Sequence, residues 1–329
     1  MCSAPSCSDR TCGTCGRSRS ASRTATSTCA ASEAAASRAT ARFKHERAAE
    51  RAGKPAPSRR DLLARKAVVT LFFEASTRTR SSFEMAAHAL GADVLSFQKD
   101  ASSVSKGESL ADTVRNLEAI GADVLVVRHP CAGASRAVAR VVQSTVINAG
   151  DGFHEHPTQA LLDALTLRER LGSLAGKSIA IVGDIAHSRV ARSNVHCLSK
   201  LGAKVRVAGP STLMPAGIEK LGCEVARSLA DALRGADAVM ALRIQQERIA
   251  DARIPGARDY SRVWGLTPKT LELLPPGSVV LHPGPVNRGV ELSPEVLDSD
   301  RSLVMDQVDS GVAVRMAALA LCLRARVSA

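Results

Sequence analysis

Hydroxyl and guanidinium groups alternate in the sequence Ser-Thr-Arg-Thr-Arg at residues 76–80. An apolar run at 67–73 precedes this stretch and predicts a buried strand, and apolar residues with helical spacing follow it as far as Leu90. The polar stretch therefore lies where a strand leads into a helix N-terminus, whose free N–H groups and positive dipole end favour anions. These residues predict a phosphate-binding site. An ordinary Ser/Thr helix cap beside solvated arginines is the alternative interpretation.

Other polar residues also follow predicted strands. The strands are expected at 122–128, 144–149, 177–182, 238–242 and 278–282. The residues at or just after their ends are Arg128, His156, Gln159, Arg189, Arg243, Gln245, Gly284 and Pro285. The carboxyl ends of parallel strands meet at one edge of a sheet, where ligands bind. Four arginines from four strand ends, counting Arg78, predict a pocket for a substrate with several negative charges.

The order of the predicted elements gives the fold class. Strands and helices alternate from about residue 59, and residues 177–208 read as one complete strand–helix–strand unit. This alternation predicts an α/β protein with two doubly wound parallel-sheet domains, and 329 residues are enough for both. An apolar helix is expected at the C-terminus, from residue 305 to 324.

The positive charge is concentrated at the N-terminus. Residues 1–60 hold 12 of the 44 basic and 4 of the 32 acidic residues, so they contribute +8 to the net charge of +12. Residues 1–58 are rich in Ser, Ala and Arg and predict a disordered or weakly helical tail. Because the rest is nearly balanced, with aromatic residues only 2% of the chain, the charge does not indicate a nucleic-acid-binding protein.

Cysteine and histidine patterns offer little support for a metal site. Five of the nine cysteines lie in the first 30 residues, including a CxxC at 12–15, but no second CxxC pair follows. The sequence His154-Glu155-His156 runs directly into a predicted helix start, so we expect no metal there and no cofactor. Scattered single cysteines, no apolar stretch of membrane-spanning length and no secretory signal predict a soluble cytoplasmic protein.

Taken together, the polar motifs resemble those of the aspartate carbamoyltransferases, the catalytic chains of pyrimidine (UMP) biosynthesis. The resemblance extends from about residue 68 to residue 324. Its motifs, in the order that the family has them, are residues 76–80, Lys106-Gly107-Glu108, Arg128-His129-Pro130, residues 156–159, Arg243-Ile244-Gln245 and residues 282–285. It implies a carbamoyl-phosphate-binding domain at 59–155, completed by the C-terminal helix 305–329, and an aspartate-binding domain at 156–304.

The resemblance also implies the role of each residue. Carbamoyl phosphate and L-aspartate are the expected substrates, with the catalytic groups on Arg78, Thr79, Arg128 and His156. Carbamoyl phosphate is further expected to contact Ser76, Thr77, Ser102, Gln159, Gly284 and Pro285. The aspartate carboxylates are expected to bind Lys106, Arg189, Arg243 and Gln245. The segment around Ser102 and Lys106 is, from composition alone, a polar loop typical of a solvated surface.

In this family Ser102 and Lys106 would enter the site of a neighbouring subunit, so the resemblance implies a homotrimer with shared active sites. It also leaves room for regulatory or dihydroorotase-like partner chains. Family members begin with one or two amphipathic helices packed on the first domain, whereas residues 1–58 lack that pattern.

Two other enzyme classes are weaker interpretations. Ornithine carbamoyltransferases share the 76–80 and 156–159 motifs, but they usually have His-Cys-Leu-Pro where this chain has His282-Pro283-Gly284-Pro285. Arg243, Gln245 and Lys106 also favour a dianionic acceptor over a cationic one. A nucleotide-binding dehydrogenase is suggested by the strand–helix–strand unit around Gly183, but no GxGxxG occurs there.

Overall fold

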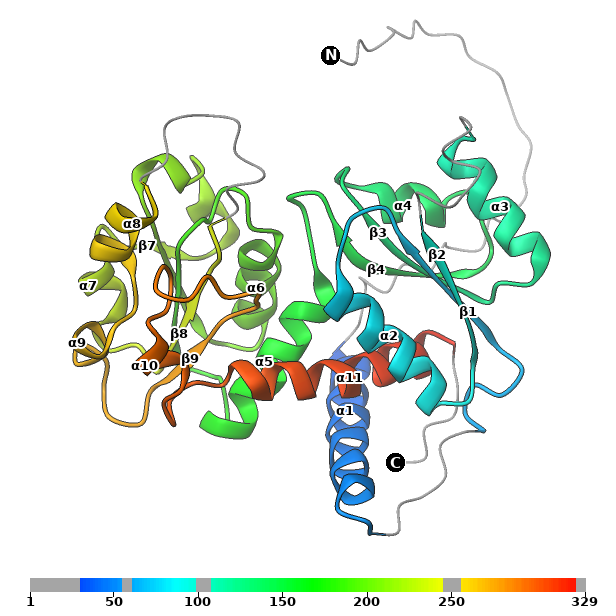
Figure 1. Cartoon of the computed structure of the whole chain (residues 1–329), viewed down its shortest axis with the longest axis horizontal. Helices are drawn as coiled ribbons and strands as arrows, with labels where there is room; N and C mark the ends of the chain where they lie inside the picture. Colours follow the sequence, from blue (N-terminus) through cyan, green and yellow to red (C-terminus); the bar gives the residue numbers. More distant parts are fainter. Residues whose placement is uncertain (1–29, 55–60, 99–107, 245–255, 324–329) are drawn as a thin grey trace, which may run out of the picture.

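The computed structural model describes residues 30–54, 61–98, 108–244 and 256–323. Two parallel sheets form two lobes, and Figure 1 shows the first on the right and the second on the left. The first sheet has the order β2-β1-β3-β4 and the second the order β7-β6-β5-β8-β9. Together with the C-terminal helix, they confirm the predicted fold class of two parallel-sheet α/β domains.

The first sheet consists of β1 (Ala67–Phe72), β2 (Asp93–Gln98), β3 (Val124–His129) and β4 (Thr145–Asp151). The second consists of β5 (Ser178–Val182), β6 (Lys204–Ala208), β7 (Glu224–Val225), β8 (Ala238–Ala241) and β9 (Val279–Leu281). The longer helices are α1 (Ala30–Arg51), α2 (Thr77–Ala89), α3 (Leu110–Ile120), α5 (Pro157–Leu171), α6 (Arg189–Lys200), α8 (Ala257–Trp264) and α11 (Val304–Cys322). The shorter ones are α4 (Ala134–Ala139), α7 (Leu229–Leu233), α9 (Pro268–Leu271), α10 (Pro294–Leu297) and the 3₁₀ turns at Ser211–Leu213 and Ile218–Leu221.

β1 is buried because helices cover both faces of the first sheet. Its side chains alternate between the faces, as a strand requires. Val68 and Phe72 join a core with residues of α2 and α11, while Val69 and Leu71 join a second core with residues of α3 and α4. Burial on both faces explains why the strand reads as a continuous apolar run in the sequence.

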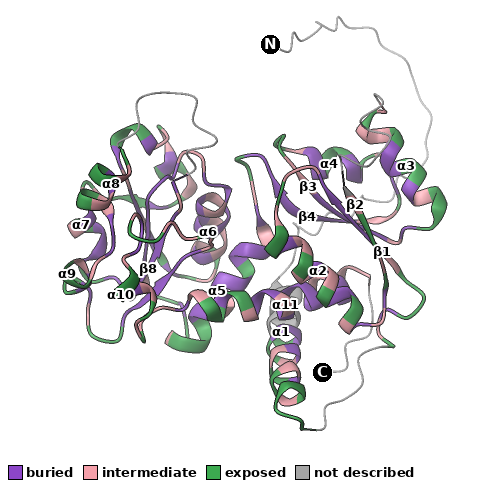
Figure 2. Ribbon diagram, viewed as in Figure 1, coloured by how far each residue is buried: buried purple, intermediate pink, exposed green. Residues whose placement is uncertain are grey.

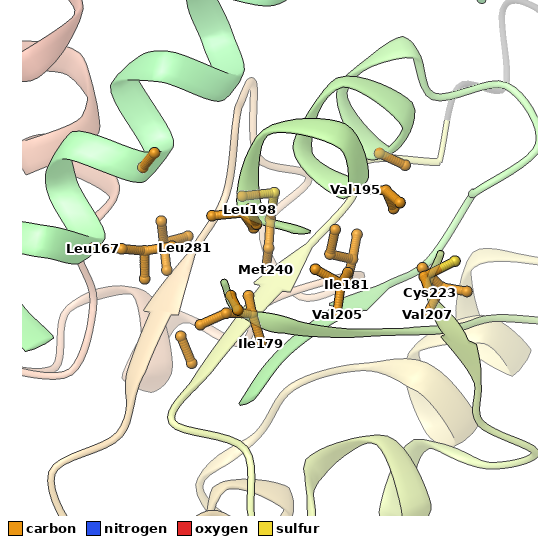
Figure 3. Close-up of a cluster of buried hydrophobic side chains, with 14 of the residues drawn as sticks. Leu167, Ile179, Ile181, Val195, Leu198, Val205, Val207, Cys223, Met240 and Leu281 are labelled. Carbon is orange, nitrogen blue, oxygen red and sulfur yellow. The ribbon is translucent and has the colours of Figure 1, made fainter. Parts of the chain in front are cut away.

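The second sheet repeats this arrangement around β5. Ile179 and Ile181 pack against α6, in the cluster that Figure 3 shows, and Ala180 and Val182 pack against α7 on the other face. Figure 2 shows both sheets as buried layers between helices whose outer surfaces are exposed. Packing on both faces of each sheet therefore fixes the positions of the strand ends.

Two long helices join the lobes. α5 follows β4 directly, yet its Leu167 lies in the core of the second sheet. α11 follows the second sheet, and its Met316 lies in the core of the first. The helices cross between the lobes in Figure 1, where the Thr166 hydroxyl donates to Ser310 Oγ at 3.0 Å. None of the described helices, α11 included, has the length and apolarity to cross a bilayer.

The structure corrects the prediction for part of residues 1–58. Helix α1 packs against α11, which it crosses steeply in Figure 1, and its Ala39 and Phe43 are buried in the core of the first sheet. The sequence did not reveal this helix because its contact with the core needs few apolar residues. The long arginine and lysine side chains beside those residues extend to polar partners. Lys44 Nζ, for example, donates to Glu169 Oε2 of α5 at 2.5 Å and to Ser310 Oγ of α11 at 2.9 Å. The CxxC at 12–15 lies outside the described residues.

Candidate active site

The N-terminus of α2 presents polar groups directly after β1. Ser76 takes the N-cap position, but its side chain makes no capping hydrogen bond. Thr77 and Arg78 in the first turn are exposed, whereas Thr79 is buried. The Ser76 hydroxyl and the first N–H groups of the helix are therefore available to an anion, which the dipole of α2 also favours.

A carboxylate in the loop between β1 and α2 forms ion pairs with two of the predicted arginines. Glu74 Oε2 lies 3.4 Å from Arg128 Nε, at the end of β3, and 2.6 Å from Arg189 Nη2, at the start of α6. The Arg128 guanidinium also donates to the carbonyl oxygen of Ala149 at 3.2 Å. Glu74 thus links the first sheet to a helix of the second lobe, and it holds two cationic side chains from different lobes within reach of one ligand.

Gly150 allows these arginines to approach the end of β4. Its φ of +122° lies in the region that favours glycine. A Cβ atom at this position would lie 3.2 Å from Arg189 Cζ and 3.3 Å from Arg128 Nη1. Glycine at position 150 therefore leaves the room that the two guanidinium groups occupy.

Arg78 reaches across to the loop after β9. Its guanidinium occupies the place that a Cβ atom of Gly284 would take. The Gly284 N–H donates to His282 Nδ1 at 2.8 Å, and the Gly284–Pro285 peptide bond is cis. The pKa of His282 falls to about 3, because the imidazole is buried and lies near Arg78 and Arg243. A neutral His282 therefore holds the loop as a hydrogen-bond acceptor.

His156 is a buried residue near several of the arginines. It is only 4% exposed, and its backbone N–H donates to Ser193 Oγ at 2.8 Å. Its pKa is held well below the usual value, first by burial and then by the charges of Arg128, Arg189, Arg315 and Arg78. His156 is therefore neutral near pH 7, with one ring N–H to donate. Among the described residues, its Nδ1 has no hydrogen-bond partner.

Arg243 completes the cationic cluster at the end of β8. Although Arg78 as a residue is exposed, partial burial of its guanidinium and the nearby charge of Arg243 lower its pKa. Gln159, three residues after His156 in the first turn of α5, is buried and donates from Nε2 to Asp163 Oδ1 at 2.9 Å. The predicted residues Ser102, Lys106 and Gln245 lie outside the described residues.

Sequence reasoning missed two charged residues of this region. Glu74 lies two positions before the 76–80 stretch, so an acidic residue beside a basic motif was the available signal. Arg315 is buried in α11 with its guanidinium 5.2 Å from the ring centroid of Phe83, and burial and the charge of Arg78 lower its pKa to about 10. A single arginine within an apolar helix was the signal for it.

The described residues hold no cluster of three or more His, Cys, Asp or Glu side chains that would suit a metal ion. His154, from the His-Glu-His sequence, has its Nδ1 3.0 Å from Asp151 Oδ2. Asp151 also accepts from the N–H groups of Gly133 and Glu155, so it organises the β4–α5 loop. The site offers hydrogen-bond donors and positive charge.

Two family models match the chain over almost its whole length. The carbamoyl-P binding domain of aspartate/ornithine carbamoyltransferase matches residues 21–169, and the Asp/Orn binding domain matches residues 175–322. The chain belongs to the aspartate/ornithine carbamoyltransferase family.

Curated relatives within this carbamoyltransferase family are similar over most of the chain. The aspartate carbamoyltransferase catalytic subunit of Anaeromyxobacter sp. (strain K) is 61% identical over 273 residues, which cover 83% of this chain and 86% of the relative. The catalytic subunit of Myxococcus xanthus (strain DK1622) is 57% identical over 266 residues, covering 81% of this chain and 90% of the relative.

Solved carbamoyltransferase structures share the fold. Aspartate transcarbamoylase from Trypanosoma cruzi, in complex with carbamoyl aspartate and phosphate, has a TM-score of 0.75 at 34% identity and covers 88% of this chain and 91% of its own. The same enzyme with N-(phosphonacetyl)-L-aspartic acid also gives 0.75, at 33% identity, with 87% and 91% coverage.

Proposed function

We propose that this chain transfers the carbamoyl group from carbamoyl phosphate to the amine of L-aspartate, giving N-carbamoyl-L-aspartate and phosphate. The observation that carries the proposal is the convergence of arginines from both lobes around the neutral His156. Two anionic substrates repel each other in water, and a fixed set of positive groups removes that obstacle. Relatives in the family carry the name aspartate carbamoyltransferase catalytic subunit.

The phosphate end of carbamoyl phosphate is assigned to the N-terminus of α2 and to Arg128. Ser76 and Thr77 offer hydroxyl and backbone donors, and the exposed side chain of Arg78 adds a positive charge. Guanidinium groups suit phosphate because their donors match two oxygen atoms at once. The helix dipole acts in the same direction.

The carbamoyl oxygen is assigned to donors from Thr79, Arg128 and His156. Negative charge grows on this oxygen as the amine attacks the carbamoyl carbon, and fixed donors stabilise it. A neutral His156 can donate one N–H without bringing a further positive charge into the arginine cluster. The carbamoyl amine is assigned to the carbonyl oxygen of Gln159 and to the backbone at Gly284 and Pro285.

The reaction needs no nucleophile from the protein. The aspartate nitrogen attacks the carbamoyl carbon, a C–N bond forms, and the C–O bond to phosphate breaks. The departing phosphate takes the proton that the amine loses. The protein contributes orientation of the two reactants, which is worth several orders of magnitude in rate.

The aspartate carboxylates are assigned to Arg189 and Arg243, together with Lys106 and Gln245. Arg189 is buried and held by Glu74, so it is oriented before the substrate binds. The acceptor side is thus cationic, which favours a dicarboxylate and opposes the side-chain ammonium of ornithine. Incubating the protein with carbamoyl phosphate and either aspartate or ornithine tests the proposal, and carbamoylation of ornithine alone would refute it.

Glu74→Gln should raise the KM for aspartate about tenfold. The substitution removes the negative charge that Arg128 and Arg189 share, so that the two guanidinium groups repel each other and Arg189 loses its fixed orientation. Steady-state kinetics with aspartate as the varied substrate measures the effect. Glu169→Gln is the control, since it breaks the ion pair with Lys44 far from the strand ends. Equal KM values for the two variants would contradict the role of Glu74.

The assembly and the domain division belong to the same proposal. We infer a cytoplasmic homotrimer in which Ser102 and Lys106 complete a neighbouring site, as part of pyrimidine biosynthesis. The carbamoyl-phosphate domain comprises residues 59–155 with the C-terminal helix, and α1 adds to its core. The aspartate domain comprises 156–304. Mixing inactive Arg78 variants with inactive Lys106 variants tests the shared site. Recovery of activity on subunit exchange supports it, and no recovery despite mixed trimers contradicts it.

A further inference from the structure

Asp163 is a fully buried carboxylate one turn beyond Gln159 in α5. Burial raises its pKa to about 6, while hydrogen bonds from Asn194, Gln307 and Gln159 and the charge of Arg315 oppose that rise. Above that pH it is therefore a buried anion, which costs stability unless donors surround it. Core packing alone does not require a carboxylate at this position, so its presence needs another reason.

Three side-chain amides surround this carboxylate, one from each of three helices. Gln159 Nε2 of α5 and Gln307 Nε2 of α11 donate to Oδ1 at 2.9 and 2.7 Å. Asn194 Nδ2 of α6 donates to Oδ2 at 2.8 Å. An ionised carboxylate only accepts hydrogen bonds, so each amide must turn its NH₂ group toward Asp163. The carboxylate therefore decides which way round each amide lies.

The orientation of Gln159 has a direct consequence for the site. Because its NH₂ group is committed to Asp163, its carbonyl oxygen is the end left for a ligand. That end is a pure acceptor. It can pair with an N–H group of a substrate, but not with a methyl group or a carbonyl oxygen.

Asp163 acts on the loop after β9 by a second route. With its NH₂ group on Asp163, Gln307 must present its carbonyl oxygen, and Oε1 accepts from the His282 N–H at 2.9 Å. His282 Nδ1 in turn accepts from the Gly284 N–H at 2.8 Å. The backbone at Gly284 and Pro285, the other proposed partner of the carbamoyl amine, is thus held through the same carboxylate.

We propose that Asp163 is a positioning residue that makes the site selective for a donor substrate bearing an N–H₂ group next to the reacting carbonyl. It does so by turning the Gln159 carbonyl oxygen and the loop after β9 toward that amine. The inference rests on the proposed carbamoyl transfer. An isosteric acetyl group, with methyl in place of the amine, leaves these acceptors unpaired and is disfavoured for that reason.

The test compares carbamoyl phosphate with acetyl phosphate in the Asp163→Asn variant. The measured quantity is the inhibition constant of acetyl phosphate divided by the KM of carbamoyl phosphate, with aspartate saturating. An asparagine at 163 can offer its own NH₂ group to Gln159 and allow that amide to turn over. We expect the ratio to fall about tenfold, as the loss of one well-oriented hydrogen bond in a buried site predicts.

Two further variants separate positioning from general stability. Thr166→Val removes a buried hydrogen bond between the same helices, α5 and α11, and should leave the ratio unchanged even if the melting temperature falls. Gln159→Met should lower the ratio by itself. Asp163→Asn should lower the ratio less in the Gln159→Met variant than in the wild type. The reason is that both substitutions act on the same contact.

An unchanged ratio in Asp163→Asn, with normal folding, would overturn the inference. If that variant does not fold, Gln307→Met tests the second route, where a severalfold fall is expected and an unchanged ratio counts against it. A wild-type protein that does not carbamoylate aspartate would instead refute the proposed function. The two failures are therefore distinguishable.

Discussion

Replacing Arg78 by alanine is expected to lower kcat about a thousandfold while leaving the fold intact. The guanidinium lies at the N-terminus of α2 and against Gly284, so it reaches from the proposed phosphate site to the loop that we assign to the carbamoyl amine. Loss of a charged group that stabilises the transition state costs roughly 3–4 kcal/mol, which corresponds to two to three orders of magnitude in rate. Steady-state kinetics with both substrates saturating measures it.

The melting temperature of Arg78→Ala should be equal to or higher than that of the wild type. Arg78 is exposed, and its charge lowers the pKa of the buried Arg315, so its removal relieves repulsion between two cations. Arg243→Ala is the comparison for catalysis, because it should mainly raise the KM for aspartate. Full wild-type turnover in Arg78→Ala would contradict the assignment of the phosphate site.

Replacing Gly150 by alanine is expected to lower kcat/KM about a hundredfold. The new Cβ atom would lie 3.2–3.3 Å from the guanidinium atoms of Arg189 and Arg128, so both groups must shift by several tenths of an ångström. Displacements of about 1 Å can cost two orders of magnitude when the geometry of two reactants is at stake. Kinetics with each substrate varied in turn gives the effect.

Gly121→Ala is the matched control for this change. Its φ is +113°, close to the +122° of Gly150, but nothing lies within 4 Å of the added Cβ. Both variants should lose a similar amount of stability from backbone strain, of the order of 1 kcal/mol. If Gly121→Ala loses as much activity as Gly150→Ala, backbone strain and not arginine displacement is the cause.

The sequence predicted the elements whose pattern is local. The run at 67–73 and the strands around 124–129 and 178–182 were found because both of their faces are buried, which leaves an uninterrupted apolar signature. By contrast, β2 (Asp93–Gln98) was not predicted. It is an edge strand with several exposed residues, so its sequence carries less of that signature.

The sequence alone determined which residue types gather at the strand ends, because the topological rule for parallel sheets needs only the order of strands and the positions of polar residues. It located Arg78, Arg128, His156, Arg189 and Arg243 in this way. Only the tertiary structure decided which of them face one another. Several interactions join segments that are distant in the chain. They involve Glu74, Arg315, Asp163 and the packing of Phe43 with α11. No local pattern encodes such contacts, since they depend on how two independently packed sheets are held together.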